Sequence, residues 1–281
     1  IRPAFGLMLA MLLQSIINHV NSSVDKIILG IMTTKIEVAI YSIAATIITM
    51  YNLIPTTISG FFQPTVTKMI INDATKSDLT DLVIRVGRWQ FMIVGAILCG
   101  FVLFGKDFII LWTGNSMIKA WYIALIIMVP NMIPLVQSVC LSILNGYDKR
   151  LYRSLILVFI TIINIILTIL LIKMVGPIGA PIGTGISYFI GHGILLNIYY
   201  AKVIKLQIKR MFHEIFRRTW ICLILSTLIC YPFVFWSSTA VAVFFLKVLA
   251  FCILYGALLY IYGWNNQEKK EVVNIAKHLL N

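Results

Sequence analysis

A row of polar side chains lies along the first apolar segment of the chain. In QSIINHVNSSVDKIILG (residues 14–30), Gln14, Asn18, Asn21 and Asp25 are spaced four, three and four residues apart. On a helix this spacing aligns them along one face. Polar groups left unpaired in hydrocarbon cost several kcal/mol. The face therefore either lines a cavity that binds polar ligands or forms hydrogen bonds with a neighbouring helix. Asp25 and Lys26 have a further interpretation, as the interfacial end of the span.

Two later apolar segments are interrupted by prolines. MYNLIPTTISGFFQPTVTK (50–68) contains Pro55, and VPNMIPLVQS (129–138) contains Pro130 and Pro134. A proline within a helix removes a backbone hydrogen bond, and discontinuous helices in transporters often mark ligand sites. Such breaks are either simple kinks or hinges beside a cavity. The polar cavity candidates next to Pro55 are Asn52, Thr56 and Thr57.

Small residues recur every fourth position in the segment that begins GPIGAPIGTGIS (176–187). Gly179, Gly183, Ser187 and Gly191 would form one helix face that permits close packing or sliding. Asn164 is a polar residue within the preceding apolar segment. Lys247 is a cation inside the last one, where it either faces a cavity or extends its amine toward the interface.

The composition identifies an integral membrane protein. Hydrophobic residues make up 60% of the chain and charged residues 12%, with a mean hydropathy of +0.95, whereas soluble domains carry roughly 25% charged residues. Spans of roughly 20 residues cross a bilayer core. The sequence predicts an all-α fold with about eight spans: 4–24, 38–62, 87–105, 120–144, 154–172, 178–201, 219–236 and 239–263.

The charge distribution predicts the orientation. Alternate assignment of the loops places 17 of the 23 Lys and Arg residues on the side of both termini and five on the other side, with Lys247 inside a span. By the positive-inside rule both termini are cytoplasmic. The net charge of +13 is then explained by topology, and nucleic acid is not an expected partner.

Two cytoplasmic segments resemble helices. KVIKLQIKRMFHEIFRR (202–218) places Ile204, Ile208, Met211 and Ile215 opposite its basic residues, a pattern typical of a helix on an anionic membrane surface. Residues 73–89 form a helical run that leads into the third span. Residues 106–119 are expected to separate the third and fourth spans.

Enzymatic chemistry has little support. The sequence contains no Ser/His/Asp constellation, paired-carboxylate site or phosphate-binding glycine loop. The five cysteines lack the paired spacing of zinc or redox sites. We therefore expect a transporter with no catalytic residue, metal site or cofactor.

The order of features resembles the polysaccharide flippases, the O-antigen and capsule (Wzx-type) branch of the multidrug/oligosaccharidyl-lipid/polysaccharide exporter superfamily. VDKIILGIMTTKIEVAIYSIAATI and IPTTISGFFQPTVTK resemble the family's seventh and eighth helices, and FGKDFIILWTG resembles the end of the ninth. LNGYDKRLYRSLILVFITIINIILTILLIKMVGPIGAPIGTGIS resembles its helices ten to twelve.

The resemblance implies a fourteen-helix fold of which this chain supplies helices seven to fourteen. Residues 1–203 would form the second six-helix lobe, 204–218 a basic interfacial segment, and 219–281 the two terminal helices and tail. The first residue is Ile1, so we expect a fragment whose partner is the missing first lobe.

The function implied is flipping of an undecaprenyl-diphosphate-linked oligosaccharide across the bacterial inner membrane by alternating access, in polysaccharide biosynthesis. The implied partners are the bilayer and the polyprenyl-diphosphate-linked glycan, with the polysaccharide polymerase and chain-length proteins as further candidates. The resemblance assigns the cavity to the first two spans. It also implies coupling to Na⁺ or H⁺, with these candidate residues: Asn18, Asn21, Asp25, Asn164 and Thr184.

Three other functions remain open. A multidrug exporter should show acidic cavity residues, and only Asp25 fits. A lipid II flippase of the same superfamily should show cavity arginines, and the sequence places none in mid-membrane. A non-transport scaffold for glycan assembly is the third.

Overall fold

The computed structural model describes residues 23–147, 150–236, 240–265, 268–270 and 272. Every regular element in these ranges is helical, which confirms the all-α prediction. The first described helix covers residues 23–32. The helices that follow are α2 (Lys35–Ile71), α3 (Lys76–Thr113), α4 (Lys119–Val136), α5 (Ser138–Gly146), α6 (Arg150–Val175), α7 (Gly179–Tyr188), α8 (Leu196–Tyr199), α9 (Ile208–Phe216), α10 (Thr219–Cys230) and α11 (Val241–Leu258).

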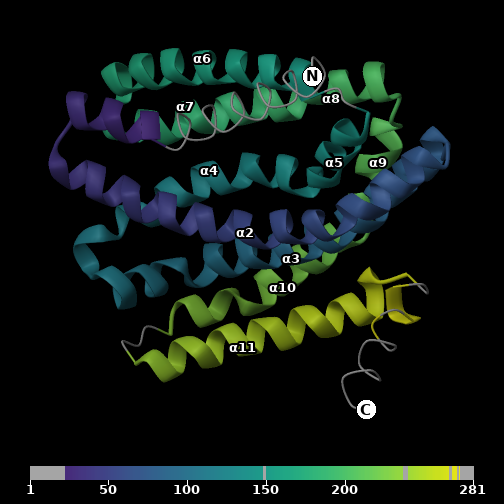
Figure 1. The fold of residues 1–281 in the computed structure, drawn as a ribbon. Helices are drawn as coiled ribbons and strands as arrows, with labels where there is room; N and C mark the ends of the chain where they lie inside the picture. The colour runs from purple at the N-terminus through teal and green to yellow at the C-terminus, as the bar shows by residue number, and fades with distance from the viewer. Residues whose placement is uncertain (1–22, 148–149, 237–239, 266–267, 271, 273–281) are drawn as a thin grey trace.

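Within the described residues, six helical stretches are long and apolar enough to cross a membrane, so the chain is a multi-pass membrane protein. One stretch, Arg153–Ile204, has 52 residues. It contains α6 and α7, which lie side by side and are joined by a turn at Gly176, where φ is +75° (Figure 1). This stretch therefore corresponds to the two predicted spans 154–172 and 178–201. Of the predicted span 4–24, residues 4–22 lie outside the described residues.

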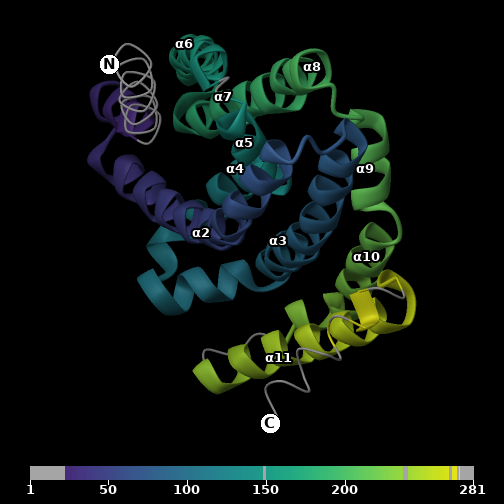
Figure 2. The ribbon, with the colours of Figure 1, turned by 45° about the vertical axis from the view of Figure 1, so that its right-hand side comes forward.

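The helices stack in one elongated bundle. Figure 1 shows α6 and α7 at one end of the stack, α2, α3 and α4 in the middle, and α10 and α11 at the other end. Turned by 45°, the molecule shows α10 and α11 on the far side of α3 from α6 and α7 (Figure 2). The chain thus forms a larger helix group and a terminal pair that packs against α3.

Two predicted boundaries were wrong for identifiable reasons. The expected separator 106–119 is helical up to Thr113, because its charged residues have partners: Asp107 pairs with Lys247, and Lys106 lies over the ring of Trp121. The expected single span 120–144 is two helices, α4 and α5, separated at Gln137. Sequence hydropathy registers neither feature: the first depends on tertiary partners, and the second follows the prolines Pro130 and Pro134 in an apolar run.

The helical run predicted at 73–89 is present as the first turns of α3. Thr75 caps this helix: its hydroxyl accepts from the backbone N–H of Asp78 at 3.2 Å, and the Asp78 carboxylate accepts from the Thr75 N–H at 2.9 Å. This reciprocal pair satisfies two donors that the first turn of a helix would leave free. It fixes where α3 begins.

The basic amphipathic segment contains α9, whose apolar face packs on the protein itself. Met211 and Ile215 are fully buried against α3. Gly87 makes this contact close, since a Cβ there would lie 2.7 Å from Ile215 Cδ1. Lys209 and Arg210 on the opposite face stay exposed. The amphipathic pattern is therefore explained at least in part by docking on α3.

The small-residue face of 176–191 packs against α6. A Cβ at Gly179 would lie 2.3 Å from the Leu171 carbonyl carbon, and one at Gly183 would lie 2.9 Å from the Thr168 amide nitrogen. Both atoms belong to the backbone and cannot yield easily. Glycine at these positions lets the backbones of α6 and α7 approach closely.

This packing predicts that a Gly→Ala substitution changes the free energy of unfolding in opposite directions at two positions. Gly179→Ala should lower the free energy of unfolding by about 1–3 kcal/mol, because its methyl group overlaps the α6 backbone. Gly256→Ala in α11 meets nothing within 4 Å and should raise it by up to about 1 kcal/mol through helix propensity. Thermal unfolding of the purified protein in detergent measures both. Equal shifts would contradict the packing.

Candidate functional site

The side chain of Asp25 is the centre of a buried polar cluster. Asp25 is only 2% exposed. Tyr41 on α2 donates its hydroxyl to Asp25 Oδ2 at 2.6 Å, and Thr184 on α7 donates to the same oxygen at 2.6 Å. Thr168 on α6 lies 3.3 Å from Asp25 Oδ1. Four helices from two distant parts of the sequence thus converge on one carboxylate.

Asn164 on α6 completes this group. Its Oδ1 accepts from Thr168 at 3.1 Å and its Nδ2 donates to Thr184 Oγ1 at 3.3 Å. Asn164 and Thr168 are four residues apart and share a helix face. We call Asp25, Tyr41, Asn164, Thr168 and Thr184 the Asp25 cluster. Three of the predicted coupling residues, Asp25, Asn164 and Thr184, are therefore in contact.

The Asp25 cluster holds a carboxylate without a matching positive charge. Among the described residues no Lys, Arg or His forms an ion pair with Asp25. Each threonine hydroxyl has one hydrogen to donate and two acceptors within hydrogen-bond distance. Thr168 can donate to Asp25 or to Asn164, and Thr184 can donate to Asp25 or to the Ala180 carbonyl. A buried carboxylate surrounded by neutral oxygens suits a small cation or a proton.

Asp25 and Thr184 also line a cavity of about 350 Å³. Its walls come from the first described helix, α2, α4, α6 and α7, with the π-helical turn Phe189–Leu195 that extends α7. The polar lining residues besides the Asp25 cluster are Lys26, Thr46, Thr49, Asn52, Arg153 and His192. The cavity therefore offers amides, hydroxyls and cations to a ligand.

Arg153 is the cavity residue that sequence reasoning missed. It directly precedes the predicted span 154–172 and so reads as a loop residue, but it lies on α6 and lines the cavity. Its Nε and Nη1 atoms are buried and have no hydrogen-bond partner in the described part of the chain. A signal was available: Arg153 precedes Asn164 by eleven residues, three helical turns, so both occupy one face. Tyr41 and Thr168 were missed as well.

The remaining candidates on α2 divide into two groups. Asn52 lines the cavity, and its Oδ1 accepts from Asn131 Nδ2 on α4 at 2.6 Å. Thr56 and Thr57 are exposed and donate to the Leu53 carbonyl of their own helix at 2.9 and 2.8 Å. They satisfy the backbone near Pro55 and do not line this cavity.

Helix α2 continues through Pro55 without a break, whereas α4 ends at Val136, two residues after Pro134, and Gln90 of α3 contacts both regions. Gln90 Nε2 lies 3.1 Å from the Pro55 carbonyl of α2 and 2.7 Å from Ser138 Oγ, at the start of α5. Gln137, at the break that follows Pro130 and Pro134, donates to Asn197, which in turn donates to the His192 carbonyl. The Gln90 side chain thus links α2 near Pro55 to the start of α5, and Gln137 links the α4–α5 junction to Asn197.

The other predicted site residues lie elsewhere. Lys247 is 3% exposed and its Nζ is 3.0 Å from Asp107 Oδ2, between α11 and α3. It is not among the residues that line the Asp25 cavity. Gln14, Asn18 and Asn21 lie outside the described residues.

Comparison with known proteins gives one informative relative. No protein-family model and no solved structure matches the chain. A protein described as "Probable flippase AglR", from Haloferax volcanii, is 31% identical over 178 residues, which is 60% of this chain. The chain is similar to a probable flippase. The aligned part covers only 36% of that relative's length.

The Asp25 cluster predicts a coupled effect on stability. Thr184→Val should lower the free energy of unfolding by about 1.5–3 kcal/mol, because it removes a hydrogen bond to a buried charged group. In an Asp25→Asn background the same change should cost about 1 kcal/mol, since the bond is then neutral.

Thr57→Val serves as the matched control and should have little effect, because Thr57 is exposed and bonds only its own helix. Chemical or thermal unfolding of the four variants measures the coupling. Identical costs in the two backgrounds would show that Thr184 does not act on Asp25.

Proposed function

We propose that this chain is the second lobe and terminal helix pair of a flippase for polyprenyl-diphosphate-linked oligosaccharides. The observation that supports this most is the cavity, where a buried acid and an arginine with two unpartnered nitrogens line one space between membrane helices. The similarity to a probable flippase agrees with it. The proposed activity is transport across the membrane, with both termini of this chain on the cytoplasmic side.

The chemistry of the cavity fits an anionic glycolipid head. Sugar hydroxyls require amide and hydroxyl partners, which Asn52, Thr46 and Thr49 provide. A diphosphate requires cations, and a guanidinium with free donors binds phosphate oxygens well. Arg153 and Lys26 are the cations on this wall. We assign Arg153 to the diphosphate.

A cavity of about 350 Å³ holds only part of such a substrate. The proposal therefore places the remaining wall on a first lobe, as the resemblance to the flippases implies. The substrate would be an undecaprenyl-diphosphate-linked repeat unit of O-antigen, capsule or exopolysaccharide in a bacterial inner membrane. Alternating access would then arise from movement of the two lobes about the cavity.

The Asp25 cluster is the proposed cation-coupling site. Asp25, Asn164, Thr168 and Thr184 present oxygens from three helices around an uncompensated carboxylate, and oxygen ligands are those that hard cations prefer. A bound Na⁺ or proton would neutralise the carboxylate. Asp25, Thr168 and Thr184 would then hold the first described helix against α6 and α7.

Arg153 also reopens a second candidate, a lipid II flippase. The sequence had counted against it because no arginine was expected in the cavity. Arg153 weakens that argument, because one arginine does line the described cavity. A cationic-drug exporter gains nothing, because the described lining contains two basic side chains and one acid, Asp25, apart from His192.

Flipping by the intact protein in proteoliposomes tests the proposal. Arg153→Gln should lower the rate of lipid-linked oligosaccharide translocation about 10- to 100-fold, since loss of a charge-assisted hydrogen bond costs about 1.5–3 kcal/mol. Thr57→Val, outside the cavity, should retain the wild-type rate.

A comparison of substrates separates the two candidates. A neutral-headed glycolipid should be unaffected by Arg153→Gln if the arginine acts on the diphosphate. An unchanged rate for the diphosphate substrate, in correctly inserted protein, would overturn the assignment. Competition by lipid II alone would favour the second candidate.

A further inference from the structure

The turn between α9 and α10 exposes two arginines that form no ion pair with any described residue. Arg217 and Arg218 connect Phe216, the last residue of α9, to Thr219, the first of α10, and both side chains are exposed. Nearby arginines differ: Arg210 pairs with Asp81 at 2.6 Å and Arg88 pairs with Glu268 at 2.6 Å. The turn therefore concentrates positive charge that nothing in the described chain neutralises.

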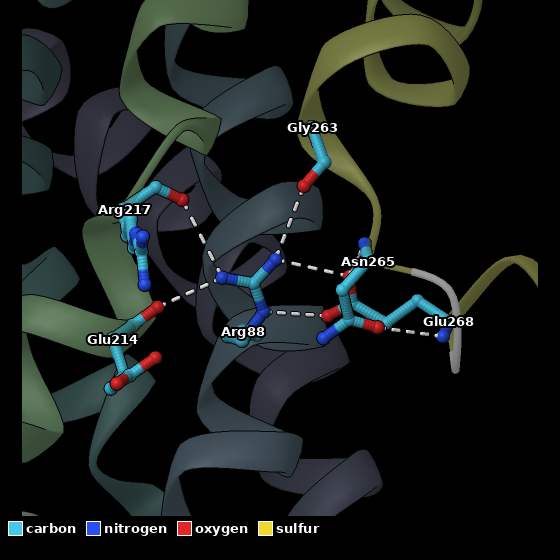
Figure 3. Close-up of polar contacts among 6 residues, drawn as sticks. All are labelled: Arg88, Glu214, Arg217, Gly263, Asn265 and Glu268. Carbon is cyan, nitrogen blue, oxygen red and sulfur yellow. Dashed lines mark hydrogen bonds and ion pairs between the residues drawn. The ribbon is translucent and has the colours of Figure 1, made fainter.

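This turn is held in place by Arg88 of α3. Figure 3 shows the Arg88 guanidinium between two groups of residues. Glu214 and Arg217, at the end of α9, lie on one side of it, and Gly263 and Glu268, which follow α11, lie on the other. Its Nη1 donates to the carbonyls of Glu214 at 2.8 Å and Arg217 at 3.4 Å, and its Nη2 donates to the Gly263 carbonyl at 3.2 Å. The Arg88 contacts use the backbone of the turn, so the side chains of Arg217 and Arg218 remain available.

The backbone of Arg218 adopts a rare conformation. Its φ is +65°, a left-handed value that an L-residue with a side chain adopts only at a cost. The Thr219 N–H donates to the Arg217 carbonyl at 2.8 Å and closes the turn. Such strained positions cluster where a fixed side-chain direction is useful. Here the Arg88 contacts and the closed turn fix the backbone from which both arginine side chains extend.

A pocket of about 490 Å³ opens at the turn. Its donors come from Arg217, Arg218 and His213, and its apolar walls from Phe212, Phe216, Trp220 and Ile221. A ligand that fits this lining has a phosphate-like anion at one end and hydrocarbon at the other, because arginine forks match phosphate oxygens.

The apolar wall continues from the pocket along α10. Trp220 is 51% exposed, as expected of an aromatic ring at a membrane interface. Below it the exposed side chains of α10 are all aliphatic: Ile221, Ile224, Leu225, Leu228 and Ile229. The pocket thus lies where a basic helix end meets a lipid-facing wall, at the level of lipid headgroups.

We propose that this pocket, the α9–α10 elbow, binds the headgroup phosphate of an anionic phospholipid whose acyl chains follow α10. A free phosphate ion would use only the arginines and histidine, whereas the aromatic and aliphatic walls require a chain-bearing ligand. The proposal concerns the terminal helix pair and does not depend on flipping by the Asp25 cavity.

Lipid retention by the intact purified protein tests this site. Native mass spectrometry should show phosphatidylglycerol retained by the wild type in preference to phosphatidylcholine. Arg217→Gln/Arg218→Gln should lower retained phosphatidylglycerol at least fivefold. Lys202→Gln/Lys209→Gln removes the same charge from exposed positions of the same region and should leave retention unchanged.

Further readouts make each outcome decisive. Unfolding temperatures in phosphatidylcholine alone should agree between the two double variants and the wild type, since Arg88 contacts only backbone atoms of the turn. Arg217→Lys/Arg218→Lys keeps the charge and should retain an intermediate amount of lipid. Equal loss in both glutamine variants, unchanged retention in the arginine variant, or full displacement by inorganic phosphate would each overturn the proposal.

Discussion

A carboxylate buried without a counter-charge is the constraint around which the larger helix group is organised. Asp25 is stabilised by hydroxyls of Tyr41, Thr168 and Thr184, which belong to three different helices. No single helix could provide them, because a helix presents only one face to a neighbour. The position of this acid therefore requires α2, α6 and α7 to meet at one point, and the cavity lies beside that point.

Close packing of α6 and α7 makes this convergence possible. A Cβ at Gly183 would lie 3.0 Å from Thr168 Oγ1 and 2.9 Å from the Thr168 amide nitrogen. A larger side chain there would separate Thr168 from Thr184, one residue beyond. The small-residue face is thus connected to the polar chemistry as well as to helix packing. At the other end of the molecule, ion pairs connect the helices. Lys247–Asp107 joins α11 to α3, and Arg88–Glu268 joins the residues after α11 to α3.

The sequence predicted the features that depend on local composition. Apolar runs identified the membrane helices, and the spacing of polar residues singled out Asp25, while the family resemblance grouped it with Asn164 and Thr184. Features that depend on distant partners could not be predicted. Arg88 and Glu268 are 180 residues apart, and Asp107 looked like a loop residue because its partner Lys247 lies on another helix. Arg153 was misplaced for a different reason: its basic neighbours resemble a cytoplasmic loop, and only its helical register with Asn164 places it in the cavity.

The proposed Na⁺ site in the Asp25 cluster is tested most directly by the unfolding temperature of the intact protein in NaCl compared with choline chloride at equal ionic strength. The account predicts a Na⁺-specific stabilisation, about 2.7 kcal/mol when Na⁺ is at about 100 times its Kd, that Asp25→Asn abolishes and Thr57→Val preserves. A Na⁺ effect that persists in Asp25→Asn would contradict the site, and equal stability of the wild-type protein in the two salts would contradict Na⁺ binding and leave the proton as the coupling ion.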